Sequence, residues 1–156
     1  MLDIKKLLTD AVDFCSSANR TDLISENKSG LLKSQDRIVH SKFRYSIARD
    51  IASYIILNYG YIVKNIKLYG STMEYNAGKY SDIDLIIHVE SMGREIREDI
   101  KSIDKLLVEG YYSMIEENDS PEYLMDVQII DDGDSNINPS AAYLKYIMMN
   151  DSVLVM

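Results

Sequence analysis

Apolar side chains in residues 1–60 recur every three or four positions, as they do along one face of a helix. The spacing predicts a first helix over residues 3–15, followed by a polar loop over 16–29. A longer helix is predicted over 31–58, with Gly60 as its C-terminal stop. Its apolar face, which we expect to pack against a sheet or another subunit, comprises Val39, Phe43, Ile47, Ile51 and Ile55.

After residue 60 the pattern changes to short runs rich in β-branched and aromatic residues, which are typical of strands. Such strands are predicted over 62–69, 83–89 and 123–130. Two helices are predicted among them, one over 93–109 with Gly110 at its end, and one over 140–150 after Pro139. Residues 153–155 are predicted to form a short closing strand.

The order of these elements predicts an α/β (α+β) fold, in which helices flank a small mixed β-sheet. With 156 residues, of which 46% are hydrophobic, the chain is long enough to form one domain with its own core. We expect residues 1–60 to be an all-helical N-terminal extension that packs on a core formed by residues 61–156.

The composition narrows the classes of partner. A net charge of −8 without a basic stripe argues against long nucleic acid, but it permits a nucleoside triphosphate whose charge is met by metal ions and backbone amides. The sequence has no run of about 18 apolar residues, so no membrane span is expected. The N-terminal segment does not resemble a signal peptide, and the single cysteine, Cys15, is expected to be buried as a small apolar group. We therefore expect a cytoplasmic protein.

Two acids mark the start of the second predicted strand. Side chains alternate along a strand, so Asp82 and Asp84 point to the same face, roughly 7 Å apart along the chain. Two parallel carboxylates repel each other unless a cation lies between them, and oxygen-only ligands suit Mg²⁺ or Mn²⁺. Because magnesium in proteins is usually completed by phosphate oxygens, the pair predicts a phosphorylated substrate.

The turn before this strand predicts a phosphate site. Gly70 allows a sharp exit from the first strand and a close approach of the backbone to a phosphate. If a helical turn begins at Ser71, its free amides and the hydroxyls of Ser71 and Thr72 face an anion. Lys79 could also contact phosphate, although a lysine in a polar loop is more often simply solvated.

Asp126 is a third candidate acid, because it lies in the middle of an otherwise apolar strand. It could share the metal with Asp82 and Asp84 or act as a base for an attacking hydroxyl; a structural pairing with a lysine is the alternative. Asp131 and Asp132 are weaker candidates at the exit of that strand. The two histidines are interpreted as structural, with His88 partly buried and His40 at the surface or in packing.

The order and spacing of these residues resemble a pattern of the DNA polymerase beta superfamily of nucleotidyltransferases, especially its minimal members. The pattern is Gly70-Ser71, ten further residues, Asp82-x-Asp84 and the later Asp126. The resemblance covers about residues 62–155. It implies that Asp82, Asp84 and Asp126 bind the metal ions, while Gly70 and Ser71 form the phosphate loop.

The family's chemistry implies metal-dependent transfer of a nucleoside monophosphate, expected to be AMP, from a nucleoside triphosphate to a hydroxyl, with release of pyrophosphate. Two alternatives stay open. Minimal relatives also act as the antitoxin half of a two-gene toxin pair, with a helical protein as partner. The second alternative is a small-molecule modifier such as an antibiotic adenylyltransferase; those enzymes usually carry a further acceptor-binding domain, for which this chain has little room.

Overall fold

The computed structural model describes residues 2–18, 28–117 and 121–134, together with a short pairing at 153–154. Its elements alternate between helices and strands, which confirms the predicted α+β class. In chain order they are α1 (Ile4–Ala18), η1 (Lys28–Lys33), α2 (Arg37–Tyr59), β1 (Val63–Tyr69), η2 (Gly70–Thr72), β2 (Ile83–Val89), α3 (Gly93–Met114), β3 (Met125–Asp131) and β4 (Val153–Leu154).

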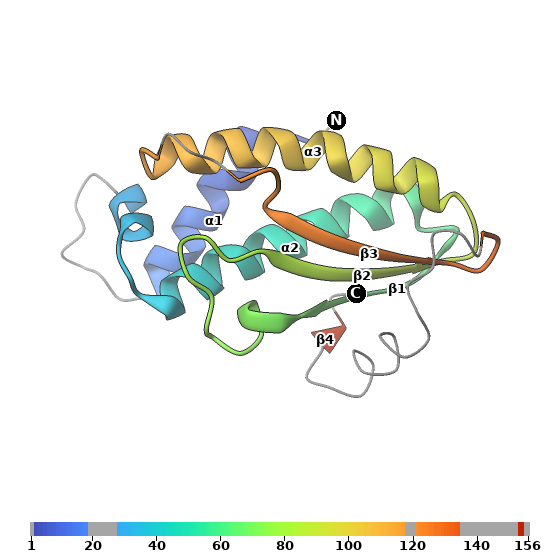
Figure 1. Ribbon diagram of the computed structural model, residues 1–156, viewed down its shortest axis with the longest axis horizontal. Coiled ribbons are helices and arrows are strands. Elements are labelled where there is room, and N and C mark those ends of the chain that lie inside the picture. Colours follow the sequence, from blue (N-terminus) through green and yellow to red (C-terminus); the bar gives the residue numbers. More distant parts are fainter. Residues whose placement is uncertain (1, 19–27, 118–120, 135–152, 155–156) are drawn as a thin grey trace.

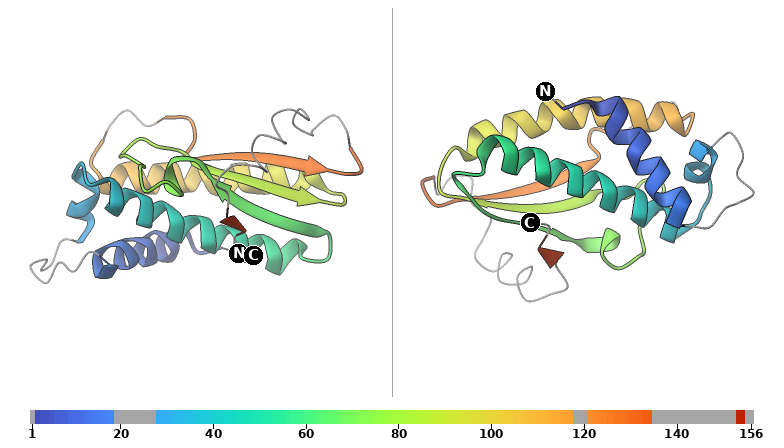
Figure 2. Two further views of the ribbon diagram at one scale, coloured as in Figure 1. Left: turned by 90° about the horizontal axis from the view of Figure 1, so that it is seen from below. Right: turned by 180° about the vertical axis from the view of Figure 1, so that it is seen from behind.

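The strands form one mixed sheet in the order β3-β2-β1-β4. β1 pairs antiparallel with both β2 and β4, whereas β2 and β3 are parallel and are joined through α3. A parallel pair needs such a crossover, because the chain must return to the same end of the sheet. Helices α1, α2 and α3 all lie on one face of the sheet (Figures 1 and 2).

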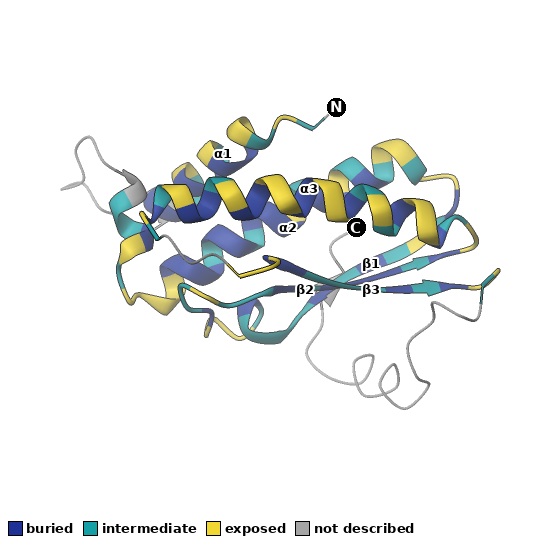
Figure 3. Ribbon diagram, turned by 45° about the horizontal axis from the view of Figure 1, so that its top comes forward, coloured by how far each residue is buried: buried dark blue, intermediate teal, exposed yellow. Residues whose placement is uncertain are grey.

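Strand alternation explains which face the helices cover. On β2, Ile83, Leu85, Ile87 and Val89 are fully buried and belong to the main apolar cluster, together with Phe43, Ile47, Ile51 and Ile55 of α2. The even-numbered side chains of β2 therefore project from the face away from the helices. Figure 3 shows the same division on α2 and α3, whose buried sides face inward.

The long helix starts later than the sequence pattern predicts. α2 begins at Arg37 rather than near residue 31, and residues 28–33 form a separate 3₁₀ turn. The reason is a side-chain cap: an Asp36 carboxylate oxygen accepts hydrogen bonds from the amides of Ile38 (3.0 Å) and Val39 (3.3 Å). Asp3 caps α1 in the same way, through the amide of Lys6.

The glycine at position 110 was predicted to end the third helix, but the helix continues beyond it. α3 continues to Met114, because Tyr111 and Tyr112 beyond the glycine are buried in the core. A Cβ at position 110 would overlap the Leu8 side chain of α1. The glycine therefore serves the close approach of α1 and α3 rather than a helix stop.

The remaining predictions have mixed outcomes. β3 is displaced to 125–131 from the predicted 123–130, β4 pairs with β1 as a closing strand, and Cys15 is buried. The predicted helix 140–150 lies outside the described residues.

The helices of the N-terminal part pack on the rest of the chain. α1 packs on α2 and α3, and α2 packs on β1 and β2; the division into two units at residue 60 stays a prediction. Among the described helices, none has the length and apolar character needed to cross a membrane.

Candidate metal and phosphate site

Three acids predicted from the sequence meet at the start of β2 and β3. Asp84 and Asp126 are direct partners in the parallel register of the two strands, and Asp82 precedes β2 by one residue. One carboxylate oxygen from each acid can be chosen so that all three lie within 4.8 Å of one another. Among the described residues, this is the one acidic group with the spacing of a metal site.

Strand alternation places this triad on the sheet face away from the helices. Asp84 and Asp126 are half-buried, so the carboxylates are held by the sheet while staying open to a ligand. Gln128, two positions along β3, contacts Asp126 through its side-chain amide at 3.4 Å. The expectation that Asp126 and Gln128 share a polar face is therefore confirmed.

The electrostatics of the triad favour a bound cation. Burial, followed by the negative charges of Asp126 and Asp82, raises the pKa of Asp84 to about 7. Burial and the charge of Asp126 also raise the pKa of Asp82. Because like charges in one partly buried site oppose ionisation, a divalent ion would relieve the repulsion. The all-oxygen donor set fits Mg²⁺ or Mn²⁺.

Gly70 lies directly against this triad. Its φ of +81° is a left-handed conformation that favours glycine. A Cβ at this position would overlap an Asp84 carboxylate oxygen and would lie 3.2 Å from the carboxyl carbon. The register explains the closeness, because Tyr69, the residue before Gly70, pairs with Asp84. The strand exit at Gly70 and the candidate metal ligand Asp84 are thus one structural unit.

A 3₁₀ turn follows at Gly70–Thr72, closed by hydrogen bonds from the amide of Met73 to the Gly70 carbonyl (3.0 Å) and from Asn76 to the Ser71 carbonyl (2.9 Å). The first amides of such a turn have no partner within it and are suited to an anion. The predicted helical turn at Ser71 is therefore present beside Asp84.

Two of the predicted phosphate-binding side chains have other surroundings. Thr72 is 4% exposed and lines a cavity of about 290 Å³ with Ser41, Tyr45 and Met73, and its hydroxyl has no hydrogen-bond partner within the described structure. The Lys79 ammonium lies 3.8 Å from a Glu117 carboxylate oxygen. Phosphate binding by Ser71, Thr72 and Lys79 stays a prediction.

The acids at the exit of β3 do not join the triad. Asp131 is buried and accepts hydrogen bonds from the amides of Gly93 (2.8 Å) and Gly133 (2.7 Å), so it fixes the start of α3 and the turn after β3. Asp132 accepts from Lys64 and lies 3.0 Å from the His88 ring. His88 therefore contacts an acid at the opposite end of the strand from Asp82 and Asp84.

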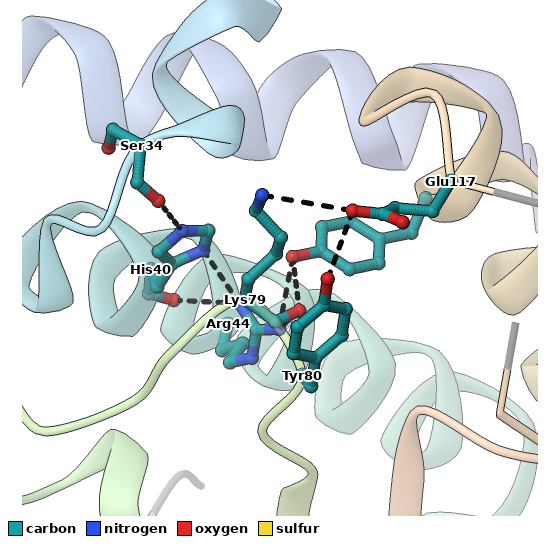
Figure 4. Close-up of polar contacts among 7 residues, drawn as sticks. Ser34, His40, Arg44, Lys79, Tyr80 and Glu117 are labelled. Atoms are coloured by element: carbon teal, nitrogen blue, oxygen red, sulfur yellow. Dashed lines mark hydrogen bonds and ion pairs between the residues drawn. The ribbon is translucent and has the colours of Figure 1, made fainter. Parts of the chain in front are cut away.

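Sequence reasoning missed the groups that hold the loop before Asp82. From α2, Arg37 donates to the Asn76 carbonyl, the Ser41 hydroxyl accepts from the Ala77 amide, and Arg44 donates to the carbonyls of Lys79 and Ser81. His40, predicted at the surface or in packing, is buried beside Arg44 (Figure 4). A signal existed, because positions 37, 41 and 44 form a polar stripe beside the apolar face of α2.

Asp104 of α3 was also missed. It is buried, and its carboxylate accepts hydrogen bonds from the amides of Leu124 and Met125, each at 3.0 Å. Burial raises its pKa to about 6 against the opposing effect of these bonds. Asp104 thus holds Leu124 and the first residue of β3, Met125, which directly precedes Asp126.

Comparison with known proteins identifies the family of this chain. The search of curated proteins found no match. A solved structure of a Sulfolobus solfataricus protein assigned as a nucleotidyltransferase aligns at 15% identity and a TM-score of 0.41, covering 78% of this chain and 86% of that one, a likeness too weak to argue from. The model of the nucleotidyltransferase domain family matches residues 49–139, which include Gly70 and all three acids. The chain therefore belongs to the nucleotidyltransferase domain family.

Proposed function

We propose that the protein is a metal-dependent nucleotidyltransferase that moves AMP from ATP to a hydroxyl group and releases pyrophosphate. The observation that carries the proposal is the convergence of Asp82, Asp84 and Asp126 within 4.8 Å, beside the glycine turn at Gly70. Membership of the nucleotidyltransferase domain family and the clustering of the three acids support the proposal.

The acids fit a divalent ion by donor type, spacing and charge. Asp82, Asp84 and Asp126 would hold Mg²⁺ or Mn²⁺ through one oxygen each, and the raised pKa of Asp84 marks a carboxylate that gains from a nearby cation. When bound, the metal supplies charge neutralisation for the triphosphate and lowers the pKa of the attacking hydroxyl.

Phosphate binding is assigned to the turn that leaves β1. The amides of Ser71 and Thr72 would bind the β- and γ-phosphates, with the Ser71 hydroxyl as an additional donor. Lys79 would reach the same phosphates by exchanging its ion pair with Glu117, a half-buried carboxylate, for the triphosphate. Gly70 keeps the turn close enough to Asp84 for phosphate and metal to meet.

Asp126 is assigned the role of the base that accepts the proton of the acceptor hydroxyl. The hydroxyl oxygen bonds to the α-phosphorus, the bond from that phosphorus to the bridging oxygen breaks, and pyrophosphate leaves. The hydroxyl proton passes to an Asp126 oxygen, while Gln128 orients the carboxylate from the neighbouring position on the same face.

The experiment that tests the function uses each of the four nucleoside triphosphates, labelled at the α-phosphate, with Mg²⁺ and a cell lysate. Label transferred to a protein identifies a macromolecular acceptor, as in the two-gene toxin pairs, and turnover on aminoglycosides identifies a small-molecule acceptor. The Asp82→Asn/Asp84→Asn double variant is the control. Transfer by the double variant equal to that of the wild type would exclude the triad as the active site.

A further inference from the structure

Arg44 is a fully buried cation whose hydrogen-bonding capacity is completely used. Its Nε donates to the Ser81 carbonyl (2.9 Å), and its Nη2 donates to the Lys79 carbonyl (3.0 Å) and the Tyr111 hydroxyl (3.2 Å). Its Nη1 contacts the His40 carbonyl and the His40 ring, each at 3.3 Å. A guanidinium has five N–H donors, and here each has an acceptor.

His40 completes this arrangement as a neutral acceptor. Its Nε2 lies 2.9 Å from the Ser34 carbonyl, and because a carbonyl can only accept, the proton is on Nε2. The other ring nitrogen, Nδ1, is then free to accept from Arg44. Burial lowers the pKa of His40, which favours the neutral form that this contact requires. Figure 4 shows Arg44 between His40 and the carbonyl of Lys79.

The bond to Ser81 bears directly on the metal-binding triad. The Ser81 carbonyl and the Asp82 amide belong to one planar peptide unit, so a donor on that carbonyl fixes the orientation of Asp82 as well. Asp82 lies outside β2 and has no place in its ladder. On its other side the Ile83 amide donates to the Leu124 carbonyl at 2.8 Å. Asp82 is thus held between one peptide fixed by Arg44 and another fixed by the sheet.

The charge of Arg44 matters beyond its hydrogen bonds. Within the described part of the chain, Arg44 forms no ion pair with a carboxylate; its bonding partners are carbonyls, a hydroxyl and a neutral ring. A buried charge without a counter-ion is costly, so a residue with purely structural duties would be expected to be neutral. The acid in the peptide unit that Arg44 holds is Asp82, because the Ser81 carbonyl of that unit accepts from the Arg44 Nε at 2.9 Å.

We propose that Arg44 is a positioning residue for the metal site: it fixes the Ser81–Asp82 peptide and places a buried positive charge beside that peptide. The inference rests on the proposed function, because it assigns Asp82 to a metal ion. Arg44 does not contact the metal or the substrate in this assignment; it acts through Asp82. Tyr111 supports it by accepting from Arg44 and donating to the Lys79 carbonyl at 2.7 Å.

The test compares Mn²⁺ affinity by calorimetry in the wild type, Arg44→Met, Arg44→Lys and the control Arg37→Met. Arg37 lies on the same helix and binds the same loop at Asn76, so its loss changes the net charge equally without touching the Ser81–Asp82 peptide. Arg44→Met should weaken Mn²⁺ binding about 10-fold or more, as loss of an outer partner of a metal ligand does. The Mn²⁺ affinity of Arg44→Lys should lie between those of Arg44→Met and the wild type. The affinity of Arg37→Met should equal that of the wild type.

Amide hydrogen exchange of residues 79–84 is the second readout, and it should accelerate in both Arg44 variants but not in Arg37→Met. A folded Arg44 variant with the Mn²⁺ affinity and the amide exchange rates of the wild type would overturn the proposal. Failure of both variants to fold would assign Arg44 to stability alone and overturn it too. If the wild type binds no Mn²⁺, the proposed metal site is wrong, and the exchange comparison still decides whether Arg44 holds the peptide of Asp82.

Discussion

Gly70 and Asp84 occupy adjoining space so closely that the glycine has no room for a Cβ beside the carboxylate. Gly70 directly follows β1, Asp84 lies on the neighbouring antiparallel strand β2, and the left-handed φ of Gly70 turns the chain away at the point where Asp84 projects. The turn proposed to bind phosphate and the acid proposed to bind metal therefore depend on one backbone conformation.

Gly70→Ala should weaken both the fold and the metal site. The left-handed backbone costs an alanine about 1–2 kcal/mol, and the added methyl must displace the Asp84 carboxylate. Gly78→Ala is the matched control in the same loop, because its Cβ would lie 3.7 Å from Arg37, an ordinary contact. Thermal melting and Mn²⁺ calorimetry should show losses for Gly70→Ala alone; equal behaviour of the two variants would contradict the role of Gly70.

Stability of the metal-free protein should fall as pH rises from about 4 to 7. The pKa of Asp84 is raised from 3.8 to about 7, so in this interval the folded protein binds more protons than the unfolded chain. Asp104, with a raised pKa of about 6, adds to the same trend. Melting curves in EDTA should show this fall, and Asp84→Asn should flatten it. An unchanged slope in Asp84→Asn would mean that Asp84 ionises normally.

Binding of ATP should require a divalent ion. The triad would otherwise repel the triphosphate, and the chain carries a net charge of −8. Calorimetry with Mg²⁺ and with EDTA measures the difference directly. Equal affinity under the two conditions would show that the phosphates are bound without a metal bridge.

Asp126→Asn should separate binding from transfer. The substitution keeps the size of the side chain, while Asp82 and Asp84 still hold the metal and phosphates, so ATP affinity should change little. Transfer should fall by roughly 10² or more, as on loss of one well-placed transition-state group. Asp82→Asn should instead lose affinity and transfer together. Normal turnover of a folded Asp126→Asn protein would remove Asp126 from the active site.

Removal of residues 1–60 should destroy the fold of the remainder. Ile47, Ile51 and Ile55 of α2 are fully buried in the same cluster as Leu85 and Ile87 of β2, so truncation would expose the helix-facing side of the sheet. The fragment 61–156 should aggregate or melt without cooperativity. A soluble fragment with a sharp melting transition would show that the extension is an independent unit.

The sequence by itself determined the type and order of the core elements and which three acids come together. Strand 83–89 is predicted residue for residue, because its apolar run is bounded by polar turns on both sides. The spacing of Asp82 and Asp84 requires a shared face, and Asp126 is conspicuous as an acid in an apolar strand. These features follow from local periodicity, which one sequence contains in full.

Only the tertiary structure decided how distant segments meet. Gly110 has the residue type of a helix stop, but contact with Leu8 over a hundred positions away in the chain decided its role. Arg44 belongs to a polar stripe on α2 that the sequence contains, but the carbonyls that it binds lie in a loop that α2 meets only after folding. Long-range hydrogen bonds and close packing are not encoded in local periodicity, so the partners of these residues became visible only in three dimensions.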